Sequence, residues 1–149
     1  MRILKQAFTL IICGVWLVAC TSSSDRQGES SHAEKVKLQQ YMVQGKKLYE
    51  TYCSNCHQTD GKGFAKLYPP LAGADYLLDN LPAAACIIKN GMEGELEVNG
   101  VTYNQMMPAN QSLTPLEIAE ILTYISNSWG NESGLSNARD VSIWLNRCQ

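Results

Sequence analysis

The residues Cys53, Cys56 and His57 place two thiols three positions apart, with an imidazole directly after the second thiol. Three kinds of chemistry use such a group: covalent attachment of a haem, coordination of a zinc ion, and a dithiol/disulfide redox couple. Each needs different partners elsewhere in the chain, so the rest of the sequence can discriminate between them.

Zinc and redox chemistry both lack the partners that they need. A structural zinc site takes four ligands, and the histidine besides His57 is His32, in a polar segment where a solvated side chain is expected. Cys86 and Cys148 are not spaced as a second zinc knuckle. A thioredoxin-type couple needs its cysteines at a helix N-terminus, whereas this motif follows a helical apolar period and lies at a helix C-terminus. Haem attachment is therefore the favoured interpretation.

Covalent attachment of a haem suits the three residues, because the thiols can add to the two vinyl groups and the imidazole can bind the iron. Methionine supplies the second axial ligand of many such haems. Met107 is the favoured candidate, since Pro108 confines it to extended backbone and stiffens the loop that would present its sulfur. Met106 is the alternative, while Met42 and Met92 are interpreted as packing residues. The sequence thus predicts one covalent haem c.

The elements around the motif are predicted to be helical. Apolar and aromatic residues recur with a helical period over residues 36–53, which places the motif at the end of an amphipathic helix. The stretch 58–76 is rich in glycine and proline and forms a long loop, of a kind that is usually functional. Residues 77–90 read as one broken helix or two short ones, interrupted by Pro82 and ended by Gly91.

A hairpin and a capped helix are predicted further along the chain. Asn99 and Gly100 form the strongest short signal for a two-residue hairpin turn. Residues 114–117 supply an N-cap threonine, a first-turn proline and a capping-box glutamate to a helix that is expected to stop at Gly130. The apolar residues of 141–145 predict a short helix or arm packed on the body. Because no strand set is adequate for a central sheet, the predicted fold class is all-α with one small β-hairpin.

Residues 1–19 have the composition of an export signal, with two cations before an apolar run that is too short to span a bilayer. The run ends in Leu-Val-Ala before Cys20, which resembles the lipobox of bacterial lipoproteins, so Cys20 is predicted to carry a lipid. The polar residues 20–34 are predicted to form a disordered tether reaching about 20 Å. Residues 35–149 remain as the folded domain, exported and anchored to a membrane on the periplasmic side or in the cell envelope.

The charge balance excludes one class of partner. The chain has 12 Lys and Arg against 14 Asp and Glu, and removal of residues 1–19 would leave ten cations against 14 anions. Nucleic-acid binding needs a basic stripe, which this mildly acidic sequence does not carry. The expected partners are redox proteins and, through the lipid, a membrane.

The segment 41–130 resembles a class I cytochrome c domain. Gly45 and Tyr49 stand eight and four residues before the first cysteine, like the glycine and the aromatic of that family's N-terminal helix. In the family these residues pack against an aliphatic and an aromatic residue of the C-terminal helix. The resemblance assigns those roles to Ile121 and Tyr124.

The resemblance also implies roles for Pro69 and Leu71. Pro69 stands twelve residues after His57 and is similar to the family's proline whose carbonyl accepts the imidazole N–H. Leu71 would pack on the haem. The predicted hairpin and the ending 122–131 resemble a bacterial periplasmic subset of these domains, while the scattered lysines do not reproduce a lysine-rich docking face.

The function implied by the resemblance is that of an electron carrier rather than an enzyme, passing single electrons between respiratory redox partners. One alternative is a dedicated electron-accepting subunit of a periplasmic dehydrogenase or reductase, so the chain is expected to be a monomer or part of a redox complex. Another is an enzyme or gas sensor whose methionine detaches to open the iron.

Cys86 and Cys148 are left over by the haem hypothesis. In an oxidising compartment such a pair can form a disulfide that clamps the tail onto the domain. Alternatively, they are two small buried hydrophobes or include a free thiol at the C-terminus. The sequence leaves both possibilities open.

Overall fold

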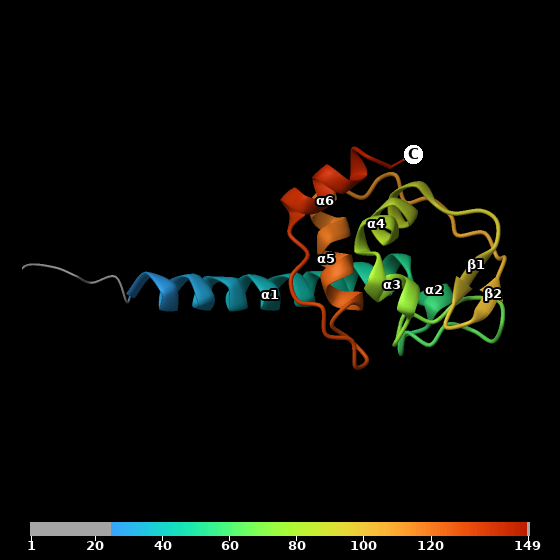
Figure 1. Ribbon diagram of the computed structural model, residues 1–149, viewed down its shortest axis with the longest axis horizontal. Helices are drawn as coiled ribbons and strands as arrows, with labels where there is room; N and C mark the ends of the chain where they lie inside the picture. The colour runs from blue at the N-terminus through green and yellow to red at the C-terminus, as the bar shows by residue number, and fades with distance from the viewer. Residues whose placement is uncertain (1–24, 149) are drawn as a thin grey trace, which may run out of the picture. The chain divides into compact units, whose positions relative to one another are not determined.

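The computed structural model describes residues 25–148, with side chains from residue 31 onward. The fold lies in a compact unit that begins at Glu34 (Figure 1). The predicted class, all-α with one small hairpin, is confirmed. The elements are α1 (Asp25–Tyr52), α2 (Ser54–His57), α3 (Asp75–Asp79), α4 (Leu81–Asn90), β1 (Leu96–Val98), β2 (Val101–Tyr103), α5 (Pro115–Ile125) and α6 (Ala138–Leu145).

The helix α1 begins at Asp25, before the apolar period that starts near residue 36. Residues 25–34 therefore lie in a helix, although their polar composition predicts a tether. The prediction relied on the spacing of apolar residues, which a polar helix does not show. Such a helix can still form, because its backbone groups bond to one another whatever the side chains are. His32 lies here and is exposed.

Close packing of α1 on α5 depends on Gly45. Gly45 and Tyr49 are buried one helical turn apart. A Cβ atom on Gly45 would overlap the carbonyl of Glu120 and lie 2.8 Å from the Cβ of Tyr124. The expected contact with Tyr124 is present, and the backbone of Glu120 also lies against the glycine. With no side chain at Gly45, the nearest atoms of the partner helix are backbone atoms.

The second helical region is divided in two, as predicted. Asn80 separates α3 from α4, and its side chain accepts a hydrogen bond from the backbone N–H of Ala83 at 3.1 Å, which caps α4. Pro82 lies in the first turn of α4, where its missing N–H costs nothing. The proline therefore begins a helix here, and Gly91 follows its last residue.

The hairpin is confirmed in its turn and its register. Val98 pairs with Val101, and Asn99 and Gly100 between them have φ values of +52° and +72°. Two positive φ values are typical of the type I′ turn that Asn-Gly favours. Asn99 and Asp75 each accept the other's backbone N–H, at 3.1 and 2.8 Å, so the hairpin tip is held on the start of α3.

The capping box of α5 is confirmed, but the helix is shorter than predicted. Thr114 accepts from the N–H of Glu117 at 3.3 Å, and Glu117 accepts from the N–H of Thr114 at 2.8 Å. The helix ends at Ile125 rather than at Gly130. The amide of Asn127 bonds backbone groups of the last helical turn and of the following loop, which offers the backbone an alternative to further helix.

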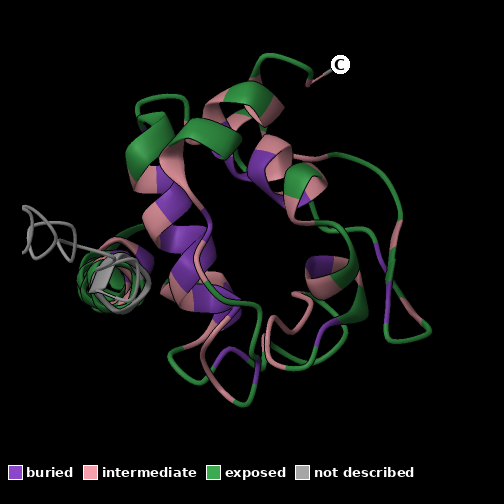
Figure 2. Cartoon of the chain, turned by 60° about the vertical axis from the view of Figure 1, so that its left-hand side comes forward, coloured by how far each residue is buried: buried purple, intermediate pink, exposed green. Residues whose placement is uncertain are grey.

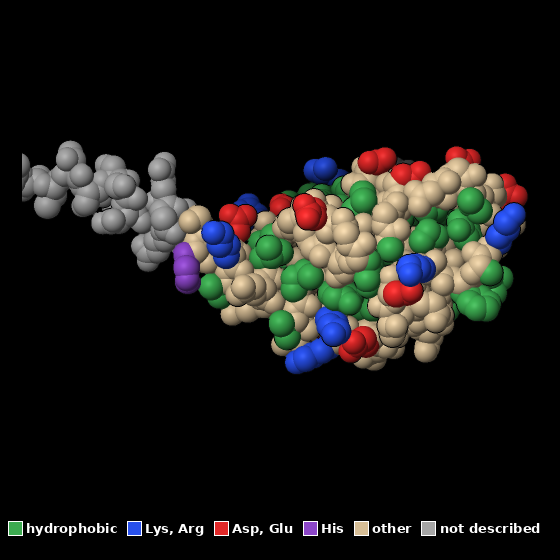
Figure 3. Space-filling view, turned by 90° about the horizontal axis from the view of Figure 1, so that it is seen from below, with side chains coloured by type: hydrophobic (Ala, Val, Ile, Leu, Met, Phe, Trp, Pro, Cys, Tyr) green, Lys and Arg blue, Asp and Glu red, His purple; other side chains and the backbone are tan. Residues whose placement is uncertain are grey.

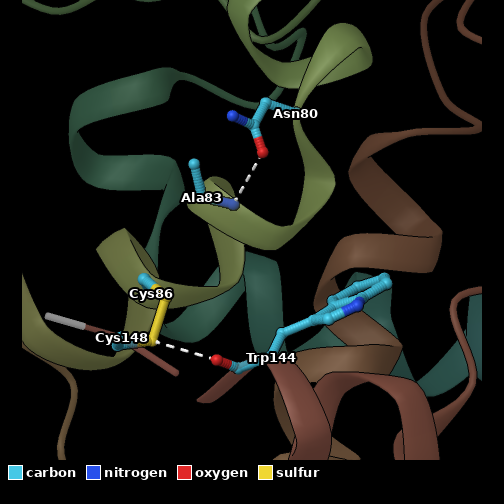
Figure 4. Close-up of a disulfide and its surroundings, with 5 residues drawn as sticks. All are labelled: Asn80, Ala83, Cys86, Trp144 and Cys148. Carbon is cyan, nitrogen blue, oxygen red and sulfur yellow. Dashed lines mark hydrogen bonds between the residues drawn. A yellow bond between two sulfur atoms is a disulfide. The ribbon is translucent and has the colours of Figure 1, made fainter. Parts of the chain in front are cut away.

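The C-terminal tail forms the helix α6, which packs on α4 and α5 (Figure 1). The structure joins Cys86 of α4 to Cys148 by a disulfide, and Figure 4 shows this bond at the end of the tail, close to Trp144. Of the two possibilities that the sequence left open, the structure has the clamp.

The core is formed mainly by α4 and α5, whose buried faces turn inward in Figure 2. Ile118, Ile121 and Leu122 of α5 are almost fully buried, and Val141 of α6 belongs to the same buried cluster. In the part of the chain that the structure describes, no helix is both long and apolar enough to cross a bilayer.

Candidate haem site

The cysteine motif lies where α1 passes into the short helix α2. The carbonyl of Cys53 accepts from the N–H of Cys56 at 3.2 Å and from that of His57 at 3.1 Å, so the chain keeps winding after α1 ends. Both thiols are free and half-buried. Burial raises the pKa of the Cys53 thiol to about 12, and the charge of Cys56 adds to the shift. A thiol with so high a pKa forms little of the thiolate that a redox couple needs.

His57 is held in one orientation by a backbone carbonyl. Its side chain is 9% exposed, and its Nδ1 lies 3.0 Å from the carbonyl oxygen of Pro69. Because a carbonyl only accepts, the hydrogen is on Nδ1 and the lone pair of Nε2 is free for a metal. Burial lowers the pKa of His57, against the opposing effect of the bond to Pro69. The imidazole is therefore neutral, as a metal ligand must be.

The loop after His57 positions Pro69 through a close backbone contact at Gly63. Gly63 donates its N–H to the carbonyl of His57 at 3.0 Å and has a φ of +66°. A Cβ atom there would overlap the carbonyl oxygen of Tyr68 and lie 2.7 Å from the carbonyl carbon of Pro69. Only glycine fits both this conformation and this contact.

Leu71 and the residues beside it are held from two sides. The carbonyl of Gly61 accepts from the N–H of Leu71 at 2.7 Å and from that of Ala72 at 2.9 Å. On the other side, the amide of Asn131 donates to the carbonyl of Leu71 at 2.9 Å and accepts from the N–H of Gly73 at 2.8 Å. The loop that carries the partner of His57 is thus fixed along its length.

An aromatic cluster closes the site on the side of α1. The ring of Tyr49 lies 5.4 Å from that of Tyr124 and 5.2 Å from that of Trp129, measured between centroids. The hydroxyl of Tyr49 donates to the carbonyl of Gln58 at 2.6 Å, and burial raises its pKa, so it remains a donor. Trp129 therefore has a packing role.

Met107 is fixed through its backbone. Its N–H donates to the carbonyl of Met92 at 2.9 Å, and the N–H of Met92 donates back at 3.0 Å. Gly91 lies against this bridge with a φ of +78°, and a Cβ atom on it would lie 2.7 Å from the carbonyl oxygen of Met107. Met107 is half-buried and packs on the core, whereas the side chain of the alternative, Met106, is 54% exposed.

The helix α4 holds the rest of the methionine loop. The ammonium of Lys89 donates to the carbonyls of Gln111 and Leu113, at 2.6 and 2.8 Å, and the N–H of Asn110 donates to the carbonyl of Ile88 at 3.2 Å. These bonds lie between the loop and α4, and Gly91, which follows α4, supports Met107. The loop position therefore depends on α4.

These residues surround a large apolar space. Two adjoining hollows lie between the motif and the methionine loop. Both are lined by Cys53, His57, Pro69, Ile87, Leu96 and Met107. An apolar slot with an imidazole, three thioethers and two thiols on its wall fits a haem c. Among the described residues, no other titratable group besides tyrosine lines it.

All the site residues expected for the haem within the described part of the chain meet at this space. Leu71 lines the first hollow, and Cys56 lines the second. Cys20 lies outside the described residues. Sequence reasoning did not single out Gly63, Lys89 or Asn131. The position of Gly63 in the glycine-rich loop was a signal that could have found it. Lys89 and Asn131 bond to residues 22 and 60 positions away, so they leave no local signal.

The helical fold and this slot define a protein that carries a covalently attached haem, and comparisons with known proteins agree. Residues 42–129 match the family model described as Cytochrome c. A cytochrome c-552 of Thermus thermophilus is 33% identical over 98 residues, which cover 58% of this chain and 69% of the relative. A cytochrome c-554(548) of Halomonas halodenitrificans is 35% identical over 77 residues, 50% of this chain and 82% of the relative.

A longer relative is the cytochrome c subunit of a quinone-type alcohol dehydrogenase of Gluconacetobacter polyoxogenes. It is 34% identical over 104 residues, 67% of this chain but only 22% of that subunit. The chain belongs to the cytochrome c family, binds one haem c and is an electron carrier.

Proposed function

We propose that the chain is a membrane-tethered monohaem cytochrome c whose haem is attached through Cys53 and Cys56 and bound axially by His57 and Met107. It carries single electrons between respiratory redox partners outside the cytoplasm. The observation that carries this proposal is that His57 and Met107 both line both hollows, each on a separately supported loop. When bound, the haem supplies an iron that takes up and gives up one electron.

The protein residues would set how readily that electron is held. The carbonyl of Pro69, 3.0 Å from Nδ1 of His57, makes the imidazole a stronger donor. The thioether of Met107 and the apolar lining, including Leu71, act in the opposite direction by favouring the reduced form. If His57 and Met107 both bound the iron, they would leave no position open to oxygen or peroxide, which would suit a carrier.

The ligand assignment is tested with a matched pair of methionine variants. Met107→Ala is expected to lose the far-red sulfur-to-iron band of the oxidised protein and to bind carbon monoxide when reduced. Met106→Ala removes a neighbouring, exposed thioether and is expected to keep the band and exclude carbon monoxide. Loss of the band in Met106→Ala alone would transfer the role to Met106. Carbon monoxide binding by the unaltered reduced protein would favour a sensor or enzyme whose methionine detaches.

The membrane tether is proposed from the Leu-Val-Ala-Cys20 sequence at the end of the export signal. A lipid on Cys20 would restrict the carrier to a layer beside the membrane. Cys20→Ser is expected to move the holoprotein from the membrane fraction to the soluble fraction without changing its visible spectrum. Equal membrane recovery of the unaltered protein and the variant would contradict lipid anchoring.

Docking of redox partners is proposed at the open side of the second hollow, beside Cys56. Tyr52, Tyr68 and Met106 line this hollow, and Tyr52 and Met106 are among the exposed hydrophobic residues. On the face that Figure 3 shows, charged side chains of both signs are interspersed with hydrophobic ones rather than forming one basic field. Such a surface suits weak and brief encounters with little dependence on ionic strength.

A second candidate function is that of a dedicated electron-accepting subunit. The similarity to the cytochrome c subunit of an alcohol dehydrogenase favours it. Gel filtration of a detergent extract from the native cells distinguishes the two: a free carrier elutes near the size of the chain in its detergent micelle, whereas a subunit co-elutes with a dehydrogenase or reductase activity.

A further inference from the structure

The side chain of Asn131 is buried and nearly saturated with backbone hydrogen bonds. It is 4% exposed. Its Nδ2 donates to the carbonyls of Leu71 and Ile125, at 2.9 and 2.8 Å, and its Oδ1 accepts from the N–H of Gly73 at 2.8 Å. Burying an amide is costly unless its groups are paired, so these three bonds hold it in one place.

The amide connects two walls of the haem slot that are far apart in sequence. Ile125 is the last residue of α5, and its side chain lines the first hollow. Leu71 lines the same hollow from the loop and lies two positions after Pro69. The chain can place Asn131 between them because it turns back after α5, with a φ of +56° at Trp129.

The Leu71 peptide is therefore clamped on both sides. Its N–H is bound by the carbonyl of Gly61 at 2.7 Å, and its carbonyl is bound by Asn131. Pro69 cannot shift along the loop without breaking one of these bonds. Since the carbonyl of Pro69 is the partner of Nδ1 of His57, the clamp also restricts the direction in which the imidazole points.

We propose that Asn131 is a positioning residue for His57: it fixes the Leu71–Gly73 backbone and, through Pro69, the orientation and basicity of the imidazole. The inference rests on the proposed role of His57 as an axial ligand. That role is tested separately, because His57→Ala is expected to abolish accumulation of normal holoprotein, whatever Asn131 does. Asn131 itself lies outside the slot and acts only through the loop.

The experiment compares Asn131→Ala with Asn127→Ala. Asn127 is a matched control, because its amide also bonds several backbone groups, at 2.7 to 3.1 Å, but all of them belong to the last turn of α5 and the loop after it. Two properties are measured in the holoprotein: the solvent exchange rate of the His57 Nδ1–H in the reduced state, by NMR, and the midpoint reduction potential. The far-red band checks that the methionine side is intact.

Asn131→Ala is expected to raise the exchange rate at least tenfold and to raise the potential, because a weaker bond to Pro69 makes the imidazole less basic and stabilises the oxidised iron less. Asn127→Ala is expected to change neither, although both variants lose stability. Equal exchange rates and potentials in the two variants, or the same shift in both, would overturn the proposal.

A third variant covers the case in which Asn131→Ala does not accumulate. Asn131→Ser keeps a small polar group that can bind one of the three partners, and it is expected to show a smaller shift in the same direction. Should neither Asn131 variant form holoprotein while Asn127→Ala does, Asn131 has a structural role only and the proposal is wrong.

Discussion

The two sides of the haem slot hold their key residues in different ways. On one side, the side chain of His57 is itself bonded, to the carbonyl of Pro69 at 3.0 Å. On the other, the backbone of Met107 is bonded to that of Met92, at 2.9 and 3.0 Å, and the side chain is positioned by packing. The first side fixes the direction of a rigid ring. The second fixes only the backbone of Met107, from which a flexible side chain extends. The histidine side should therefore tolerate change less well.

The largest expected effect comes from removing the ring. His57→Ala is expected to abolish accumulation of normal holoprotein, whereas Met107→Ala should still accumulate with covalent haem and an altered spectrum. Haem staining of denaturing gels, compared with total protein by immunoblot, measures the difference. Similar haem content in the two variants would mean that both sides contribute equally.

Glycine substitutions separate the two sides without changing His57 or Met107. Gly63→Ala forces a Cβ atom into the backbone of Tyr68 and Pro69 at a φ of +66° and is expected to lower the free energy of unfolding by about 4 kcal/mol. Gly91→Ala does the same against Met107 and should weaken the far-red band instead. Gly100→Ala is the control, because its φ is +72° but nothing lies near its Cβ, so the loss should be about 1 kcal/mol.

Chemical denaturation with both visible and far-ultraviolet detection measures these losses. A Gly63→Ala protein no less stable than Gly100→Ala would show that the loop can move away from the added methyl group. Loss of the far-red band in Gly63→Ala but not in Gly91→Ala would contradict the division into two sides.

The disulfide is expected to act on the methionine side, because Cys86 lies on α4, the helix that holds the methionine loop through Lys89. Replacing both Cys86 and Cys148 by alanine should lower the free energy of unfolding by about 3 kcal/mol. On heating, the far-red band of this variant should disappear at a lower temperature than in the unaltered protein. If the variant loses the band only on global unfolding and at an unchanged temperature, α4 does not need the clamp.

The smallest expected effect concerns the start of α5, just after the methionine loop. Thr114→Ala should cost about 1 kcal/mol by removing the N-cap. Hydrogen bonds from Thr114 hold the pKa of Glu117 below its usual value. Ionised Glu117 therefore stabilises the folded state, and this stabilisation is fully present at pH values above the ordinary glutamate pKa. That contribution is lost as the pH falls through the lower pKa of the folded state. The stability difference between the unaltered protein and Glu117→Gln should accordingly shrink in acid; a difference that stays constant with pH would contradict this.

Sequence reasoning reached those features that neighbouring residues determine. The Asn99-Gly100 turn and the box formed by Thr114 and Glu117 are both local, and both are found as predicted. The haem motif also reads directly from consecutive residues. Each of these features needs only a few positions of chain to form, so the sequence contains the whole signal.

Features that depend on distant partners were not predictable in this way. In the sequence, Asn131 is only a polar residue after a glycine. Its partner Leu71 lies 60 positions away and meets it only in the folded chain. The early end of α5 depends on where the amide of Asn127 finds partners in the next loop. The start of α1 at Asp25 escaped because polar turns of a helix carry no apolar period.

The bond between Cys86 and Cys148 also constrains how the protein can be made. Four thiols in the folded unit allow three fully paired connectivities, and the finished molecule uses none of them, since it needs one bridge and two thiols kept reduced until they react with the vinyl groups. Biogenesis therefore requires oxidation of one pair and reduction of the other along the same chain. The yield of red protein in a given host measures how well that host keeps the two tasks apart.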